Sequence, residues 1–328
     1  MRNPGLDALK VVAAIAVVFL HCVSPSVRDF DLHRGGWWIA NFVNSFSRWT
    51  VPAFVMISGA VLLPIKSSES TLFFYRKRIP RILFVTIFWT LFYFAFQYFS
   101  EQSIGVRYAL GLILKGRPYY HLWYLYMIVI LYLATPFLSA IVEKIEPEAL
   151  FWLIFALFVI SVVGSFDSVR SRFFWILALP YLSYFLAGYY LKNHALGFSA
   201  KFLVVIIILA GVLISLLTAG VLKYFGVEKM GLVESNFNPL VVLMSLAIFL
   251  LFLKLTRENA ILSRLSVLGF GVYLLHPLFL KILGSMSISA DLIHPALGVP
   301  ITVFLAVVLS GGVTLALLNF RLSARLVR

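Results

Sequence analysis

Residues 5–22 read Gly5-Leu-Asp-Ala-Leu-Lys-Val-Val-Ala-Ala-Ile-Ala-Val-Val-Phe-Leu-His-Cys22, and this stretch decides the fold class. An uninterrupted apolar run separates Lys10 from His21, and we interpret it as the first of several membrane spans. A titratable imidazole inside a span is energetically costly, so His21 is a candidate functional group. Histidine also exchanges protons readily near neutral pH, which suits proton transfer. The alternative is an interfacial histidine that only hydrogen-bonds a neighbouring helix.

The composition of the whole chain indicates a membrane protein. Of its 328 residues, 62% are hydrophobic and only 12% are charged, whereas soluble domains carry about 25% charged residues. No linker divides the chain, so we expect one domain over residues 1–328, an all-α integral membrane protein with about ten transmembrane helices. Each span needs about 20 mostly apolar residues. The ten apolar runs are Leu9–Val23, Trp38–Leu63, Ile79–Phe99, His121–Val142, Ala149–Gly164, Phe173–Leu191, Phe202–Leu222, Pro239–Leu255, Leu265–Ile282 and Leu297–Phe320.

The basic residues predict how the spans are oriented. The net charge is +14, but no aromatic-basic module accompanies it, so we expect no nucleic-acid partner. With ten spans and the N-terminus inside, sixteen Lys and Arg residues fall in inside segments and nine in outside segments. This excess predicts that both termini are cytoplasmic. The residues after His21 offer no small-x-small cleavage site, so we expect a retained first helix rather than a signal peptide.

Two polar groups mark the ends of the first span. In this orientation His21 lies toward the outer end and Lys10 lies near the cytoplasmic end, about 16 Å away along the helix axis. Asp7 precedes Lys10 by three residues, so their side chains can pair on one helical face. That pair is either a simple interfacial ion pair or part of a site.

The second run begins with polar side chains that are unsuited to lipid. An arginine within a span must face a partner or a wet cavity, so Arg48 is either a structural tie or a catalytic group. We expect Pro52 to bend this helix, and the small Ser58-Gly59 patch to permit close approach of another helix.

The densest basic cluster of the chain, Tyr75-Arg-Lys-Arg-Ile-Pro-Arg81, enters the third span at its cytoplasmic end. One interpretation is ordinary anchoring or contact with anionic lipid. The other is a site for a phosphorylated ligand, because Arg78 and Arg81 lie about one turn apart and arginine suits bidentate phosphate contacts.

Outer-half residues supply further candidates. We expect a short membrane-surface helix over Arg107–Lys115, and aromatic residues from Tyr119 to Tyr124 around His121. Those aromatics suit either the membrane interface or a sugar. His276, followed by a proline, lies in the outer half of the ninth run. The three histidines are far apart in sequence and no carboxylate accompanies them, so we expect no metal site.

These motifs, taken in order, resemble the acyltransferase-3 family of integral membrane acyltransferases over essentially the whole chain. One departure is Lys10, where many members carry arginine, so the charge is kept without the bidentate fork. The motifs that carry the resemblance are Asp7-x-Leu-Lys10 with the run to His21, Arg48-Trp-Thr-Val-Pro52 through Ser58-Gly59, Arg78-Ile-Pro-Arg81, His121-Leu-Trp-Tyr-Leu125 with Leu131-Tyr-Leu-Ala-Thr-Pro136, and Tyr273-Leu-Leu-His-Pro277.

The resemblance implies an O-acyltransferase of the bacterial cytoplasmic (inner) membrane. Its donor would be cytoplasmic acyl-CoA, usually acetyl-CoA, and its acceptor a hydroxyl of a glycan or lipid-linked sugar, with no permanently bound cofactor. His21 matches the family's essential histidine, and Arg78 with Arg81 matches its proposed donor-binding pair. The chain looks most like the subgroup that acetylates enterobacterial common antigen and similar surface polysaccharides.

A mechanism follows as a hypothesis. His21 would act as general base or form an acyl-histidine, and Arg48 would stabilise the oxyanion. The residues expected to hold the donor phosphates are Lys10, Arg76, Lys77, Arg78 and Arg81. The residues expected to hold the acceptor are His121, Trp123, Tyr124 and His276. A glycan transporter or flippase without chemistry, or a scaffold in an envelope assembly, is the alternative.

Overall fold

The computed structural model describes residues 3–65, 69–100, 105–166, 178–194, 196–255 and 257–327, without the side chains of Val106 and Phe166. Some residues used in the sequence analysis lie outside this description. They are residues 173–177 of the sixth apolar run and the basic residues Arg2, Lys66, Arg170, Arg172 and Arg328.

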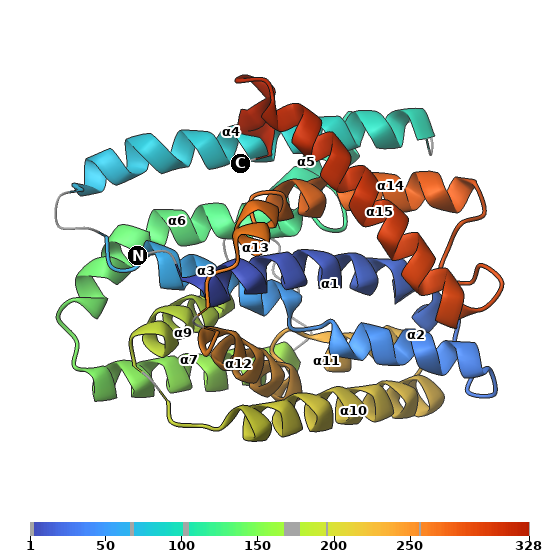
Figure 1. The fold of residues 1–328 in the computed structure, drawn as a ribbon, viewed down its shortest axis with the longest axis horizontal. Coiled ribbons are helices and arrows are strands. Elements are labelled where there is room, and N and C mark those ends of the chain that lie inside the picture. Colours follow the sequence, from blue (N-terminus) through green and yellow to red (C-terminus); the bar gives the residue numbers. More distant parts are fainter. Residues whose placement is uncertain are drawn as a thin grey trace.

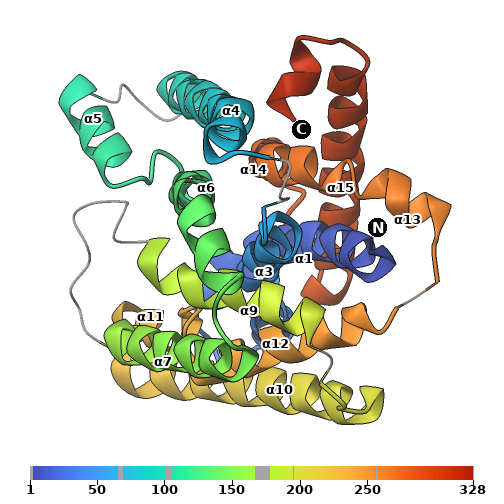
Figure 2. The same cartoon turned by 90° about the vertical axis from the view of Figure 1, so that its left-hand side faces the viewer.

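The described residues form helices and contain no strand. Figure 1 shows α1, α4, α6 and α10 running nearly parallel, with α15 crossing them obliquely, and Figure 2 shows the same bundle turned by 90°. The longer elements are α1 (Pro4–Arg28), α2 (Gly35–Phe46), α3 (Thr50–Leu62), α4 (Thr71–Ser100), α5 (Val106–Leu114), α6 (Trp123–Val142), α7 (Pro147–Phe166), α9 (Leu182–Asn193), α10 (Ala200–Phe225), α12 (Pro239–Leu253), α14 (Gly269–Ser285) and α15 (Pro295–Leu318). The shorter ones are η1 (Leu179–Tyr181), η2 (Val227–Lys229), α11 (Gly231–Glu234), α13 (Ala260–Leu265) and η3 (Ser323–Leu326).

Seven helical stretches of the described chain are long and apolar enough to cross a membrane. Each of the ten apolar runs coincides at least in part with a helix, but several of those helices are shorter than a span. The number of crossings and the side of the termini therefore stay predictions. Apolar side chains on α4 such as Ile87 and Leu91 are largely exposed, which fits a surface that faces lipid. The short helix expected after residue 106 is confirmed as α5.

Helix α1 is the centre of the bundle. Its N-terminus is specified by Asn3, whose side chain accepts a hydrogen bond from the Leu6 amide at 3.1 Å, and by a proline at the first helical position. It packs against α2, α3, α12, α13, α14 and α15. Leu9, Ala13 and Val18 are fully buried in these contacts. Residues on α1 are thus positioned by six neighbouring helices.

The second apolar run is two helices rather than one helix bent at Pro52. The chain leaves α2 after Phe46 and begins α3 at Thr50, so the expected position of the bend was wrong. The Ser47 hydroxyl donates to the Val43 carbonyl at 2.7 Å, and the Trp49 indole donates to the Phe46 carbonyl at 2.8 Å. Local side-chain hydrogen bonds of this kind compete with continued helix. Pro52 instead lies in the first turn of α3, where a missing amide hydrogen is harmless.

The expected close helix approach at Gly59 is confirmed. A Cβ atom built on Gly59 would lie 1.8 Å from the Phe185 carbonyl oxygen, and one built on Gly188 would lie 1.9 Å from the Met56 carbonyl oxygen. Helices α3 and α9 therefore touch backbone to backbone. Small residues permit such contacts between membrane helices.

Candidate active site

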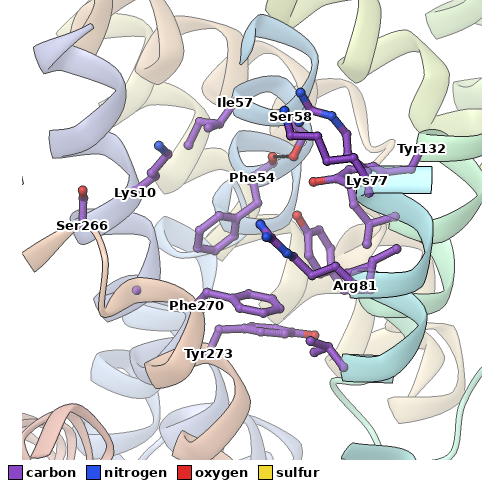
Figure 3. A pocket seen from close by; sticks show the side chains of 16 residues that line it. Lys10, Phe54, Ile57, Ser58, Lys77, Arg81, Tyr132, Ser266, Phe270 and Tyr273 are labelled. Atoms are coloured by element: carbon purple, nitrogen blue, oxygen red, sulfur yellow. Dashed lines mark hydrogen bonds between the residues drawn. The ribbon is translucent and has the colours of Figure 1, made fainter. Parts of the chain in front are cut away.

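A cavity of about 320 Å³ opens between α4 and α6 on one side and α1, α3 and α14 on the other. Four basic side chains line it, Lys10 from α1 and Lys77, Arg78 and Arg81 from α4. Figure 3 shows Lys10, Lys77 and Arg81 around this space, with Phe270 and Tyr273 beyond them. We call it the cationic cavity. The fold thus brings the positive charge of α1 and those of α4, which are distant in sequence, to one place.

Two carboxylates hold some of these cations. Lys10 Nζ lies 3.4 Å from the Asp7 carboxylate, which confirms the predicted pair on one helical face. Glu69 lies 3.5 Å from Lys77 Nζ and 3.6 Å from an Arg78 nitrogen. Arg81 has no ion pair within the described part of the chain. Three of the four cations share two carboxylates and Arg81 pairs with neither, so the cavity carries an excess of positive charge that favours an anion.

Arg78 makes two side-chain contacts that hold it beside the cavity. Its guanidinium lies 4.9 Å from the centre of the Phe74 ring, in addition to its contact with Glu69. Its Nε is buried and has no hydrogen-bond partner among the described residues. A buried donor without a partner is costly, and a bound phosphate oxygen would satisfy it.

The deep end of the cationic cavity is aromatic. Tyr124 from α6 and Tyr273 from α14 line it, with their ring centroids 5.4 Å apart. Phe270 stacks beside Tyr273 at 6.2 Å with the ring planes inclined by 16°. This end suits an apolar chain rather than a phosphate, so the cavity changes from charged to apolar along its length.

Three histidines that are distant in sequence meet beyond this aromatic end. His21 and His276 stack with centroids 5.3 Å apart, and His121 lies 5.7 Å from His276. His21 is partly exposed, whereas His121 and His276 are 2% and 0% exposed. Tyr120, half exposed, packs edge-on against His21 at 4.9 Å. We call His21, His121 and His276 the histidine cluster.

Hydrogen bonding assigns the tautomer of His276. Its Nδ1 lies 3.1 Å from the Val272 carbonyl oxygen, one turn earlier in α14. A carbonyl can only accept, so Nδ1 carries the proton and Nε2 of neutral His276 offers a lone pair. Within the part of the chain that the structure describes, that Nε2 is buried without a hydrogen-bond partner, as are both ring nitrogens of His121. The histidine cluster therefore holds unused hydrogen-bonding capacity, suited to a hydroxyl.

Tyr273 joins the cationic cavity to the histidine cluster. Its ring lines the cavity and lies 5.4 Å from the His121 ring, and its hydroxyl donates to the His121 carbonyl. Lys10 and His21, eleven residues apart on α1, mark the two ends of this arrangement at a spacing of about 16 Å. A chain that enters among the cations can thus extend toward the histidines.

Three predicted site residues, described next, neither line the cationic cavity nor belong to the histidine cluster. Arg48, in the turn between α2 and α3, forms an ion pair with Glu234 and donates from Nε to Asn44 at 2.9 Å. Trp123 packs against Tyr181 at 5.6 Å. Arg76 is exposed and is not among the described side chains that line the cationic cavity. Arg48 thus serves as a structural tie here, and its catalytic role stays a prediction.

Sequence reasoning did not select Glu69 or Glu234, and it named Tyr120 only as one of the aromatic residues around His121. Glu69 precedes α4 in a polar stretch of sequence that is typical of an exposed loop. The fold alone shows that it contacts two of the cavity cations. Among the described residues, no group of three or more His, Cys, Asp or Glu side chains is arranged to hold a metal ion.

The comparisons with known proteins agree with this architecture. The acyltransferase domain of the acyltransferase-3 family matches residues 3–316. The chain belongs to the acyltransferase-3 family. Together with the seven apolar helices, this membership makes it a multi-pass membrane protein of an acyltransferase family.

One curated relative is a serine/alanine racemase from Enterococcus gallinarum. It is 27% identical over 177 residues, which cover 50% of this chain and 23% of the relative. The alignment thus spans less than a quarter of that protein, and its name does not define the reaction of this acyltransferase-3 member. No solved structure matches the chain significantly.

Proposed function

We propose that this acyltransferase-3 member moves an acetyl or other acyl group from cytoplasmic acyl-CoA to a sugar hydroxyl of a cell-envelope glycan or lipid-linked glycan. The observation that carries the proposal is the continuity of the site. Tyr124 and Tyr273 line the cationic cavity together with its cations, and Tyr273 contacts the histidine cluster directly. One molecule with a phosphorylated end and a long neutral arm fits this sequence of environments.

The cations would bind the donor phosphates. Arginine forms charge-assisted, bidentate contacts with phosphate, and Arg78 and Arg81 project from one face of α4 into the cavity. Lys10 and Lys77 add positive charge as point donors. The pantetheine arm would then lie along the aromatic end and carry the thioester toward His21.

The chemical step needs a proton acceptor at the hydroxyl. Neutral His21 would take the hydroxyl proton as the oxygen attacks the thioester carbonyl, and the C–S bond would break as the carbonyl reforms. The thiolate leaves and regains a proton from the imidazolium. A positioned base of this kind contributes about 10²–10⁴-fold to the rate. The lone pair on His276 Nε2 would accept a hydrogen bond from a group on the other side of the stacked His21–His276 pair.

The acceptor would approach His21 from the half-exposed Tyr120 side. His21 is more exposed than the other two histidines, so it is the member of the cluster that an incoming hydroxyl can reach. His121, whose two ring nitrogens have no hydrogen-bond partner in the described ranges, would hydrogen-bond the sugar. Both termini would be cytoplasmic and the membrane a bacterial inner membrane, and the acceptor class would be a surface polysaccharide such as enterobacterial common antigen.

The test is transfer from radiolabelled acetyl-CoA by purified protein in proteoliposomes, with a panel of glycosides and extracted lipid-linked glycans as acceptors. We expect acceptor-dependent release of CoA by the wild type and its loss in His21→Ala. His33→Ala is the matched control, because His33 is an exposed histidine in the loop after α1. Transfer by folded His21→Ala at the wild-type rate contradicts the base role, and absence of any thioester loss by the wild type contradicts the function.

A further inference from the structure

A second cavity, of about 390 Å³, lies beside α4. Of the residues that the sequence analysis assigned to ligand binding, Arg81 alone is among those that line it. Its lining comprises Pro80, Arg81 and Phe84 from α4 and Arg325 from η3. We call it the lateral cavity. Arg81 also lines the cationic cavity. One arginine therefore stands in the wall between two cavities.

The segment that carries Arg325 is docked on α4. The Trp89 indole donates to the Leu326 carbonyl at 2.9 Å, and the Ser323 hydroxyl donates to the Leu317 carbonyl at 2.7 Å. Val327 is fully buried and Ala324 is 7% exposed. These contacts hold the backbone on both sides of Arg325. Its side chain, although exposed, is therefore delivered to the same place as Arg81.

The charges of the lateral cavity are unbalanced. Both arginines are exposed, and neither has an ion pair with a carboxylate in the described ranges. Two guanidinium groups that share a cavity repel each other. An anion between them removes that repulsion, and phosphate matches the fork of each guanidinium. The remaining lining, Pro80 and Phe84, offers no competing anion.

We propose that Arg81 and Arg325 jointly bind one phosphate group in the lateral cavity. The ligand chemistry is a phosphate ester, and two sources can supply it. One is the ribose 3′-phosphate of the acyl-CoA donor, a source that rests on the proposed function. A CoA molecule carries this 3′-phosphate at a distance from its diphosphate. The diphosphate would lie in the cationic cavity and the 3′-phosphate in the lateral cavity, and Arg81 lines both. The other source is the headgroup of an anionic membrane lipid.

The test for the donor source compares two ligands and two variants. Binding of acetyl-CoA and of 3′-dephospho-acetyl-CoA is measured by titration calorimetry on the full chain in detergent. If the 3′-phosphate occupies the site, Arg325→Gln weakens acetyl-CoA binding about five- to tenfold and leaves 3′-dephospho-acetyl-CoA binding unchanged. Arg321→Gln is the matched control, because Arg321 is exposed on the same segment and does not line the lateral cavity.

The test for the lipid source uses nanodiscs. Protein from discs of phosphatidylglycerol or of phosphatidylcholine is examined by native mass spectrometry for retained lipid. If the headgroup occupies the site, Arg325→Gln loses phosphatidylglycerol selectively and Arg321→Gln keeps it. Arg325→Lys retains the charge without the fork and should fall between Arg325→Gln and the wild type.

The outcomes separate the two proposals. If wild-type protein binds no acetyl-CoA, the proposed function fails, while the phosphatidylglycerol comparison still decides the lateral site. If wild-type protein binds acetyl-CoA and Arg325→Gln changes neither the discrimination against 3′-dephospho-acetyl-CoA nor phosphatidylglycerol retention, the phosphate site is overturned. Arg325 is exposed, so both Gln variants are expected to remain folded, as size-exclusion chromatography will show.

Discussion

His21 and His276 stack with ring centroids 5.3 Å apart and planes inclined by 21°, although 255 residues separate them in the chain. The contact joins α1 to α14, and the hydrogen bond to Val272 assigns the His276 proton to Nδ1. The lone pair on His276 Nε2 is therefore part of the immediate surroundings of His21, the proposed base. We therefore expect His276 Nε2 to accept a hydrogen bond from a group in the cluster, rather than merely to fill space.

The first prediction separates this role from packing. His276→Asn can keep a donor near the Val272 carbonyl but has no acceptor at the Nε2 position, whereas His276→Gln places an amide oxygen or nitrogen there. We expect Asn to lower kcat about tenfold or more with the KM for acetyl-CoA unchanged, and Gln to lose less. Steady-state kinetics on the reconstituted protein give both constants. Equal losses in the two variants, with a raised KM, would indicate packing alone.

The second prediction concerns the cations. Arg78→Gln removes a guanidinium from the cationic cavity and should raise the KM for acetyl-CoA about tenfold, with a smaller effect on kcat. Arg76→Gln is a matched control two residues away, because Arg76 is exposed and does not line the cavity. Donor titration at two ionic strengths should show a weaker salt dependence for Arg78→Gln. If Arg76→Gln and Arg78→Gln behave alike, general attraction to the basic loop explains binding.

The third prediction tests the ion pair between Arg48 and Glu234. The two side chains are 12% and 21% exposed, so removing one partner leaves the other charge largely buried. Glu234→Gln should destabilise the protein by about 2–3 kcal/mol, read as a lower midpoint of thermal unfolding in detergent. The double variant Arg48→Met/Glu234→Met should recover part of the loss. Glu228→Gln, at an exposed site in the preceding η2, should leave the midpoint unchanged.

Local spacing explains which parts of this site could be predicted from sequence. The Asp7–Lys10 pair and the shared face of Arg78 and Arg81 follow from the helical repeat alone. The positions of most helices follow from hydropathy, because long apolar runs must be helical in a bilayer. The break at Ser47 could not be predicted from hydropathy, because it depends on side-chain hydrogen bonds that compete with the helix.

Contacts between distant segments could not be predicted in the same way. Nothing in the sequence near Glu69 indicates that it contacts both Lys77 and Arg78, since Glu69 precedes α4 and the helical repeat does not relate it to them. Arg325 likewise reads as one more basic residue at the end of a span until the docking on Trp89 is known. Such pairings depend on how the helices pack, and a single sequence does not contain that information in its periodicity.

The last prediction tests the backbone contact between α3 and α9. Because a Cβ on Gly188 would lie 1.9 Å from the Met56 carbonyl oxygen, Gly188→Ala must force the two helices apart. We expect a loss of about 1–3 kcal/mol from this overpacking, visible as a lower unfolding midpoint. Gly220→Ala in α10 is the control, since no described atom outside the local backbone of α10 lies within 4 Å of its added Cβ. That substitution should be neutral or stabilising by up to about 1 kcal/mol, as alanine favours helix over glycine. A Gly188→Ala protein as stable as the control would mean that α3 and α9 are not in backbone contact.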